Sequence, residues 1–301
     1  MSLIWGIPYL LIRVAVAEIS PATLVFARTG IAALILVPIA VLRVDLRPVL
    51  ERWRWVVAFA VAEVGVPWVL LGSAEQHVTS SLAGLLVAGV PLVGAIIAVG
   101  TGGRDRFGPA AILGLLVGLS GVAAIIGVNL GSSDPTALLE MGVVVVGYAV
   151  GPAILSRRLA GLSSVGVMAL SLSLCALLYA PIAALQRPTV VPSPGTIAAV
   201  VVLGVVCTAA AFVLFSDLID EIGPVRGTVI TYVNPAVAAL LGVVVLKESF
   251  TPVMGLGFGL VILGSVLATR PAQAEAPAAR VVHGEGRPSH AEADEPASQV
   301  G

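Results

Sequence analysis

The chain has 301 residues, of which 58% are hydrophobic and only 11% are charged, and its formal net charge is −1. A soluble domain of this size carries about a quarter of charged residues, so the composition indicates a polytopic membrane protein. The near-neutral charge argues against a nucleic-acid partner. Lys247 is the single lysine and no Gly-Lys-Ser/Thr sequence occurs, which excludes a Walker-type phosphate loop.

Apolar segments cut by turn residues and charges predict ten transmembrane helices. We expect them at 2–17, 21–42, 53–73, 78–99, 108–128, 136–157, 163–185, 195–216, 224–246 and 252–270. The first segment is shorter than the ~20 residues that a span usually needs. Either this helix begins at the interface or, as we favour, the start codon of the sequence lies within the gene.

The basic residues are distributed unevenly over the connections between these segments. Four arginines lie between positions 43 and 54, and further arginines follow the fourth and sixth segments, whereas the odd-numbered connections hold only Arg187 and Lys247. Because basic residues concentrate on the cytoplasmic side, both termini are predicted to be cytoplasmic.

The two halves of the chain resemble each other. Residues 82–99, LAGLLVAGVPLVGAIIAV, match 226–243, RGTVITYVNPAVAALLGV, with Pro91 aligned on Pro235. The predicted fold is therefore an all-α integral membrane protein with two five-helix repeats, 1–130 and 136–270. An odd number of helices in each repeat gives the halves opposite orientations, which is an arrangement typical of secondary transporters.

The segment 271–301 has no apolar periodicity and is rich in Ala, Pro, Gly, Glu and Arg. Such a composition cannot bury a core. We expect a disordered cytoplasmic tail that is solvated and dispensable, in preference to a regulatory one.

Two ionisable residues are predicted to lie near the middle of the membrane, Arg28 on the second helix and Glu63 on the third. Such residues are costly in a bilayer unless they are paired or wetted. We expect them to face each other, with Arg28 binding an anionic group of a substrate and Glu63 exchanging a proton. The alternative is a static salt bridge that fixes helix packing.

Three prolines interrupt apolar segments, at Pro67, Pro91 and Pro235. A proline removes the hydrogen bond to the carbonyl four residues earlier, and a broken backbone at membrane depth persists where protein or a water-filled cavity satisfies it. We expect hinge points that line a cavity between helices 3, 4, 8 and 9. Each proline on its own is also compatible with a packing kink.

Aromatic and amide side chains lie close to these breaks, and they suit an amphipathic substrate. The candidates are Trp68, Tyr148, Tyr232 and Asn234. Trp68 is equally compatible with an interfacial aromatic belt. The glycine pairs Gly114/Gly118 and Gly255/Gly259 leave open a homodimer or close packing within one chain. We predict no metal, no cofactor and no catalytic residues, since no metal-binding or catalytic constellation is visible.

The stretches TYVNPAVAALLGVVVLKESFTPVMGLGFGLVILGSVL (231–267) and WGIPYLLIRVAVAEISPATLVFARTGIAALIL (5–36) resemble EamA-type members of the drug/metabolite transporter superfamily. This resemblance implies ten helices, cytoplasmic termini and transport, often efflux, of small metabolites such as amino acids across the bacterial inner membrane. One departure is GTGGRDRF (100–107), where many members carry a glutamate; Glu248 fills the equivalent place in the second repeat.

We therefore expect a secondary transporter in the inner membrane, in the export direction, that works by alternating access about a cavity at the midplane of the lipid bilayer. The alternatives are an uptake permease and a membrane scaffold that transports nothing.

Overall fold

The computed structural model describes residues 1–100, 109–129, 134–222 and 229–268, and these residues form helices and no strand. The elements are α1 (Ser2–Ala15), α2 (Pro21–Arg43), α3 (Arg47–Glu51), α4 (Trp53–Phe59), η1 (Ala60–Gly65), α5 (Val66–Ala74), α6 (Ser80–Val87), α7 (Val90–Gly100), α8 (Pro109–Asn129), α9 (Pro135–Arg158), α10 (Ser164–Leu185), α11 (Pro194–Gly204), η2 (Val205–Ala210), α12 (Ala211–Ile222), α14 (Val229–Val245) and α15 (Pro252–Ala268). The tail predicted to be disordered, 271–301, lies outside the described residues.

Several helix starts follow directly from the sequence. Ser20, Asp134 and Ser193 each accept a hydrogen bond from a backbone N–H in the first turn of the helix that follows, and a proline comes next in each case. A proline at the first helical position loses no hydrogen bond, because its N–H would be unpaired there in any residue. These caps fix where α2, α9 and α11 begin.

Seven helical segments are long and apolar enough to cross a membrane, within the ranges that the structure describes. The prediction of ten spans is therefore confirmed for seven segments only. The other three expected spans are apolar helices whose described parts are shorter than that length: Ser2–Ala15, Val233–Val245 within α14, and Pro252–Ala268.

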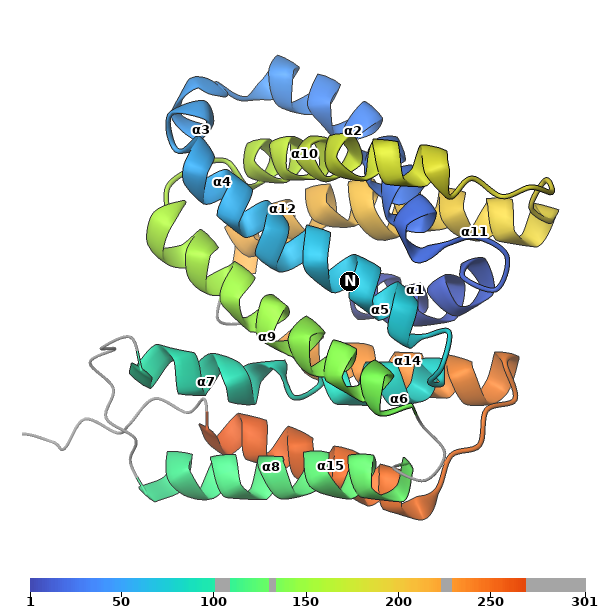
Figure 1. Ribbon diagram of the computed structural model, residues 1–301. Helices are drawn as coiled ribbons and strands as arrows, with labels where there is room; N and C mark the ends of the chain where they lie inside the picture. The colour runs from blue at the N-terminus through green and yellow to red at the C-terminus, as the bar shows by residue number, and fades with distance from the viewer. Residues whose placement is uncertain (101–108, 130–133, 223–228, 269–301) are drawn as a thin grey trace, which may run out of the picture.

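The helices run side by side, and most of them lie along one common direction (Figure 1). α2 packs against α10, and α8 packs against α15 at the opposite edge. Two apolar cores result: one is built largely from α1, α6 and α14 with their neighbours, and the other from α2, α4 and α10. Tyr148 of α9 packs against both cores, so it lies at the boundary between them.

Glycines allow the closest helix contacts. A Cβ at Gly84 of α6 would lie 2.6 Å from the Cβ of Ala238 on α14. A Cβ at Gly114 of α8 would lie 2.8 Å from the carbonyl oxygen of Gly264 on α15, whereas one at Gly259 would meet nothing within 4 Å. The Gly114/Gly118 face of α8 is thus used for packing within the chain.

Candidate transport site

Arg28 is the buried cation of the bundle, with a side chain only 7% exposed. Its Nε donates a hydrogen bond to the hydroxyl of Thr208 on η2, at 2.9 Å. Its guanidinium carbon lies 3.6 Å from the centre of the Trp68 ring, a cation–π distance. The terminal nitrogens of Arg28 have no hydrogen-bond acceptor among the described residues. Among the described residues, the guanidinium is therefore held by a hydrogen bond at Nε and by an aromatic ring on one face.

Thr208 can hold Arg28 because of the π-helical turn η2. The Thr208 hydroxyl also donates to the carbonyl of Leu203 at 2.7 Å, which fixes the threonine side chain on the turn. Gly204, just before η2, allows α2 to come close, since a Cβ there would lie 2.8 Å from the Cβ of Ile31. The irregular backbone and a missing side chain thus bring η2 against the Arg28 face of α2.

Glu63 lies on a second π-helical turn, η1, at the corresponding place in the first half of the chain. It packs against α9, where a Cβ at Gly151 would come within 2.9 Å of the Cβ of Glu63. Its Oε2 atom is buried and has no hydrogen-bond partner. The absence of a side chain at Gly151 is what leaves room for this carboxylate.

The predicted Arg28–Glu63 pair is wrong for this structure, because no ion pair joins them among the described residues. Arg28 instead binds Thr208 and Trp68. The sequence argument placed the two residues at similar depth but could not fix the rotation of the helices about their axes. That rotation turns Arg28 towards η2, while Glu63 faces α9.

Two backbone carbonyls of η1 accept hydrogen bonds from α10. The Tyr179 hydroxyl donates to the carbonyl of Gly65 at 2.9 Å, and the Cys175 thiol donates to the carbonyl of Ala60 at 3.6 Å. Irregular backbone in a membrane persists only when such groups are satisfied by protein or water. Cys175 thus has a definite partner in addition to filling space.

The three predicted helix breaks have different outcomes. Pro67 follows directly after the π-helical turn η1, and Pro91 follows a break at Ala88 and Gly89 between α6 and α7. At Pro235 the expected break is wrong, because α14 continues through the proline. The irregular turn of the second half is at η2, where the sequence has no proline to mark it.

The remaining predicted site residues divide between the site and its surroundings. Trp68 is 7% exposed and contacts Arg28, so it lies inside the bundle and not in an interfacial belt. The Tyr148 hydroxyl lies next to the Trp68 indole and interacts electrostatically with Arg28. Asn234 is half-buried on α14, where its backbone faces α1 at Gly6. The side chain of Tyr232 lies outside the described part of the structure.

Sequence reasoning missed Glu75, which it left in a loop after the third helix. This residue caps the end of α5, and its side chain is 0% exposed. The signal was available: Trp68, Leu71 and Glu75 share one helical face and all three are buried. Tyr9 of α1, also missed, is buried and interacts electrostatically with Glu75 and Arg28. The candidate site therefore extends from Arg28 towards the end of α5.

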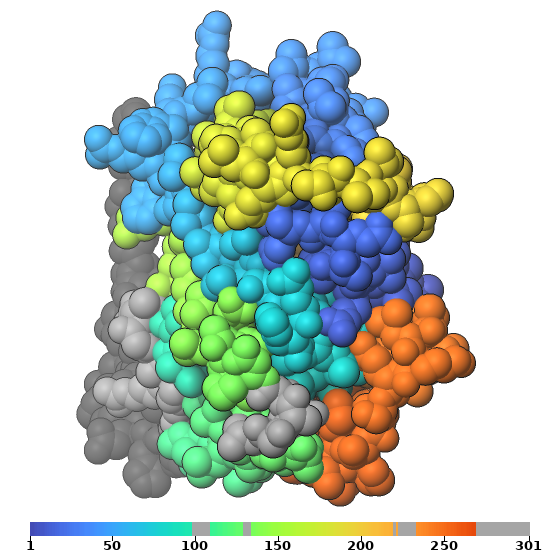
Figure 2. Space-filling model, turned by 45° about the vertical axis from the view of Figure 1, so that its right-hand side comes forward, coloured from blue at the N-terminus to red at the C-terminus, as the bar shows by residue number. Residues whose placement is uncertain are grey.

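Polar contacts close the end of the bundle at which Glu75 lies, which we call the Glu75 end (16–20, 75–81, 186–193 and 246–251). Arg13 donates to the backbone carbonyl of Glu75, and the Gln76 amide donates to the carbonyl of Val16 at 3.2 Å. The loops of this end lie together on the right of Figure 1, and Figure 2 shows the blue, cyan and orange segments pressed against one another there.

Two further hydrogen-bonded contacts at the Glu75 end are made by carboxylates, those of Glu248 and Glu18. Glu248 accepts hydrogen bonds from the backbone N–H groups of Ser80 and Ser81, at 2.8 and 2.9 Å, at the start of α6. Glu18 accepts from the N–H and the hydroxyl of Ser193, both at 2.6 Å. Carboxylates at helix N-termini are favourable there.

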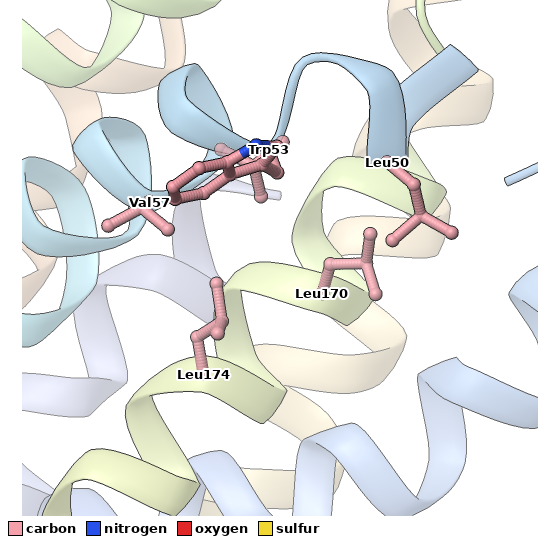
Figure 3. A pocket seen from close by; sticks show the side chains of 6 residues that line it. Leu50, Trp53, Val57, Leu170 and Leu174 are labelled. Atoms are coloured by element: carbon pink, nitrogen blue, oxygen red, sulfur yellow. The ribbon is translucent and has the colours of Figure 1, made fainter. Parts of the chain in front are cut away.

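The hollows at the surface are separate from this site. One groove of about 150 Å³ lies between α4 and α10 and is lined by apolar side chains that include Trp53, Leu170 and Leu174 (Figure 3). A second, of about 280 Å³, lies between α2 and α11. Neither is lined by Arg28, Glu63 or Glu75, and the second reaches Ile19, Pro188 and Pro192 of the Glu75 end.

Comparison with known proteins indicates that the chain is a membrane transporter. The family described as "EamA-like transporter family" matches residues 1–127 and again 136–270. The protein named "Uncharacterized inner membrane transporter YedA" from Escherichia coli (strain K12) is 28% identical over 277 residues, covering 89% of this chain and 88% of that protein. YedA of Escherichia coli O157:H7 gives the same identity and coverage.

A solved structure titled "Crystal structure of protein" is also similar. It has a TM-score of 0.62 and 25% sequence identity, and the match covers 89% of this chain and 96% of the other. The likeness therefore extends over nearly the whole of both chains.

Proposed function

We propose that this chain, which belongs to the EamA-like transporter family and is a membrane transporter, exports small metabolites that carry an anionic group, such as amino acids, by alternating access. One observation carries the proposal. Arg28 is buried with its guanidinium over the Trp68 ring, it interacts electrostatically with Tyr148, and its terminal nitrogens have no acceptor among the described residues. No described carboxylate forms an ion pair with this buried cation, and a substrate carboxylate would supply one.

The protein groups around Arg28 prepare it for this role. The Arg28 Nε donates a hydrogen bond to Thr208, and the Trp68 ring covers one face of the guanidinium. The planar group therefore cannot rotate freely. A guanidinium fixed in this way can bind a carboxylate through two parallel hydrogen bonds. The aromatic surfaces of Trp68 and Tyr148 would then contact the apolar part of the substrate.

Glu63 is our candidate for proton exchange. Its buried Oε2 has no partner, and the cost of leaving a charge there favours the neutral form until water or a substrate ammonium reaches it. In this structure Glu63 is not paired with Arg28, so its protonation would be coupled to transport through the movement of η1 and not through a direct salt bridge.

The arginine distribution supports an orientation in which both termini are cytoplasmic and the Glu75 end faces the periplasm. The structure is then closed towards the periplasm. A cytoplasm-selective reporter fused after Arg106 or Arg158 should be active, and one placed near Asp134 should be inactive. The reverse pattern would contradict the orientation and the inverted repeats.

The test of function is flux in liposomes under a pH gradient, with amino acids as probes. We expect Arg28→Lys to lower flux at least about tenfold, because the ammonium keeps the charge but loses the planar contacts. The control is Arg54→Lys, since Arg54 lies over Trp53 at the exposed surface, 5.6 Å from its ring centre. Equal flux in both variants would contradict the role of Arg28. The direction of net amino-acid flux relative to the orientation of the protein distinguishes export from uptake.

A further inference from the structure

Glu75 is the most completely enclosed acidic side chain that the structure describes. It is 0% exposed, and neither carboxylate oxygen has a hydrogen-bond partner. An ionised carboxylate without partners in such a place costs several kcal/mol or more, so these groups normally take up a proton. The role described above for Glu63 leaves this second carboxylate unexplained.

The charged and titratable groups around Glu75 come from every neighbouring element. Tyr9 and Arg13 are on α1, Arg28 is on α2, Tyr148 is on α9, and Glu248 follows α14. Burial, and then the negative charge of Glu248, raise the pKa of Glu75, whereas Arg13 and Arg28 lower it.

The available hydrogen bonds do not compensate an ionised Glu75. Arg13 donates to the backbone carbonyl of Glu75 and not to its carboxylate. The oxygens of Glu248 are occupied by Ser80 and Ser81. The closed packing at this end is thus compatible with a neutral Glu75 and is destabilised by an ionised one.

We propose that Glu75 is a proton-binding site whose neutral form holds the Glu75 end closed, so that loss of its proton opens this end. When this end opens, water reaches the carboxylate and stabilises its ionised form. When it closes, that water is expelled and the carboxylate must bind a proton again. The proposal rests on the proposed transport function and adds a detail to it. The proton is a coupling ion, and Glu75, which lies at the end of the candidate site distant from η1, is a group that binds it.

The sign of the pH effect follows from linkage. Because the closed form binds the Glu75 proton more tightly than an open, wetted form would, acid favours the closed form and alkali favours the open one. This pH dependence requires the carboxylate of Glu75. Replacing it by a neutral amide of the same shape should abolish the pH dependence.

The experiment measures how fast a membrane-impermeant maleimide labels a cysteine at the Glu75 end of the full chain in liposomes. The probe is Val78→Cys, because Val78 is 4% exposed in the closed structure. The native Cys175 and Cys207, both buried, are replaced by serine or alanine beforehand. Rates are divided by those of His77→Cys, an exposed neighbour, which cancels the pH dependence of the thiol itself.

We expect this ratio to rise about fivefold or more between about pH 5 and about pH 8. Glu75→Gln should keep the ratio low at both pH values. The matched control is Glu140→Gln, since Glu140 accepts a hydrogen bond from Ser73 on the same helix as Glu75 but is not enclosed; it should keep the pH response. Glu75→Asp, which retains an acid, should also keep it with a displaced midpoint.

A pH response in Glu75→Gln equal to that of the parent would overturn the proposal, as would loss of the response in Glu75→Asp that is folded and inserted. The labelling needs no substrate, so its outcome is independent of flux. Absence of flux with an intact pH response would contradict the transport proposal alone, and flux with an unaltered response in Glu75→Gln would contradict the Glu75 proposal alone.

Discussion

Arg28 and Thr208 join the two halves of the chain through one hydrogen bond, 2.9 Å long, between the guanidinium Nε and the threonine hydroxyl. Arg28 belongs to α2 in the first half, and Thr208 belongs to the π-helical turn η2 in the second. The same hydroxyl donates to the carbonyl of Leu203. A single side chain therefore satisfies an irregular turn and positions a buried cation.

Thr208→Val should leave both Arg28 Nε and the Leu203 carbonyl without their partner. We expect a loss of about 1–3 kcal/mol in stability, because buried polar groups would lose their hydrogen bonds. Thr208→Ser should retain most of the stability. Unfolding in mixed micelles measures the difference. The control is Thr23→Val, since the Thr23 hydroxyl bonds the Ser20 hydroxyl at 2.9 Å and the Gln186 carbonyl at 3.4 Å, in surroundings that are not fully buried. Equal stability of the valine variant and the parent would contradict this account.

Arg28→Ala and Glu63→Gln should have additive effects on stability. The two residues form no ion pair in the described structure, and each interacts electrostatically with Tyr148. Without a direct pair we expect a coupling energy of no more than about 0.5 kcal/mol. A double-mutant cycle on unfolding free energies provides the measurement. A coupling energy well above that value would show that the residues interact in the membrane after all.

Gly151→Ala should disturb the packing of η1, because the added methyl group would meet the Glu63 side chain. We expect a loss of about 1–3 kcal/mol, typical of overpacking. The control is Gly142→Ala on the same helix, where a Cβ would meet nothing within 4 Å. Thermal unfolding compares the two. Stability of Gly151→Ala equal to that of the Gly142→Ala variant would argue against close contact between α9 and Glu63.

Acid should loosen the contact between Glu18 and Ser193. Hydrogen bonds from the Ser193 side chain and backbone lower the pKa of Glu18 below its ordinary value of 4.5. The ionised form therefore stabilises the contact at neutral pH, and this contribution is lost as the pH falls through the lowered pKa of the folded state. Protection of the Ser193, Gly195 and Thr196 amides against hydrogen exchange, measured relative to the intrinsic rate at each pH, should fall in that range. Glu18→Gln should show low protection already at neutral pH. Protection unaffected by Glu18→Gln would show that the carboxylate does not hold this helix start.

The sequence determined the class of the molecule and the identity of several site residues. Its apolar segments and Ser/Asp-Pro starts located the helices, because hydropathy and capping are local properties of the chain. The cost of an arginine in a bilayer marked Arg28, and Pro67 marked the end of an irregular turn. The match of its two halves to one another agrees with the two matches to the EamA-like transporter family.

Tertiary structure alone decided which side chains meet. The partner of Arg28 is Thr208, a residue with no sequence signal, because the partner depends on the rotation of α2 and on the wider turn at η2. Glu75 looked like a loop residue, since the apolar run ends before it, yet in the fold its side chain is 0% exposed and Arg13 of α1 binds its backbone carbonyl. The depth of a residue in the membrane follows from counting residues along its helix. The direction in which its side chain points around the helix axis, and its burial, depend on contacts between segments far apart in the chain.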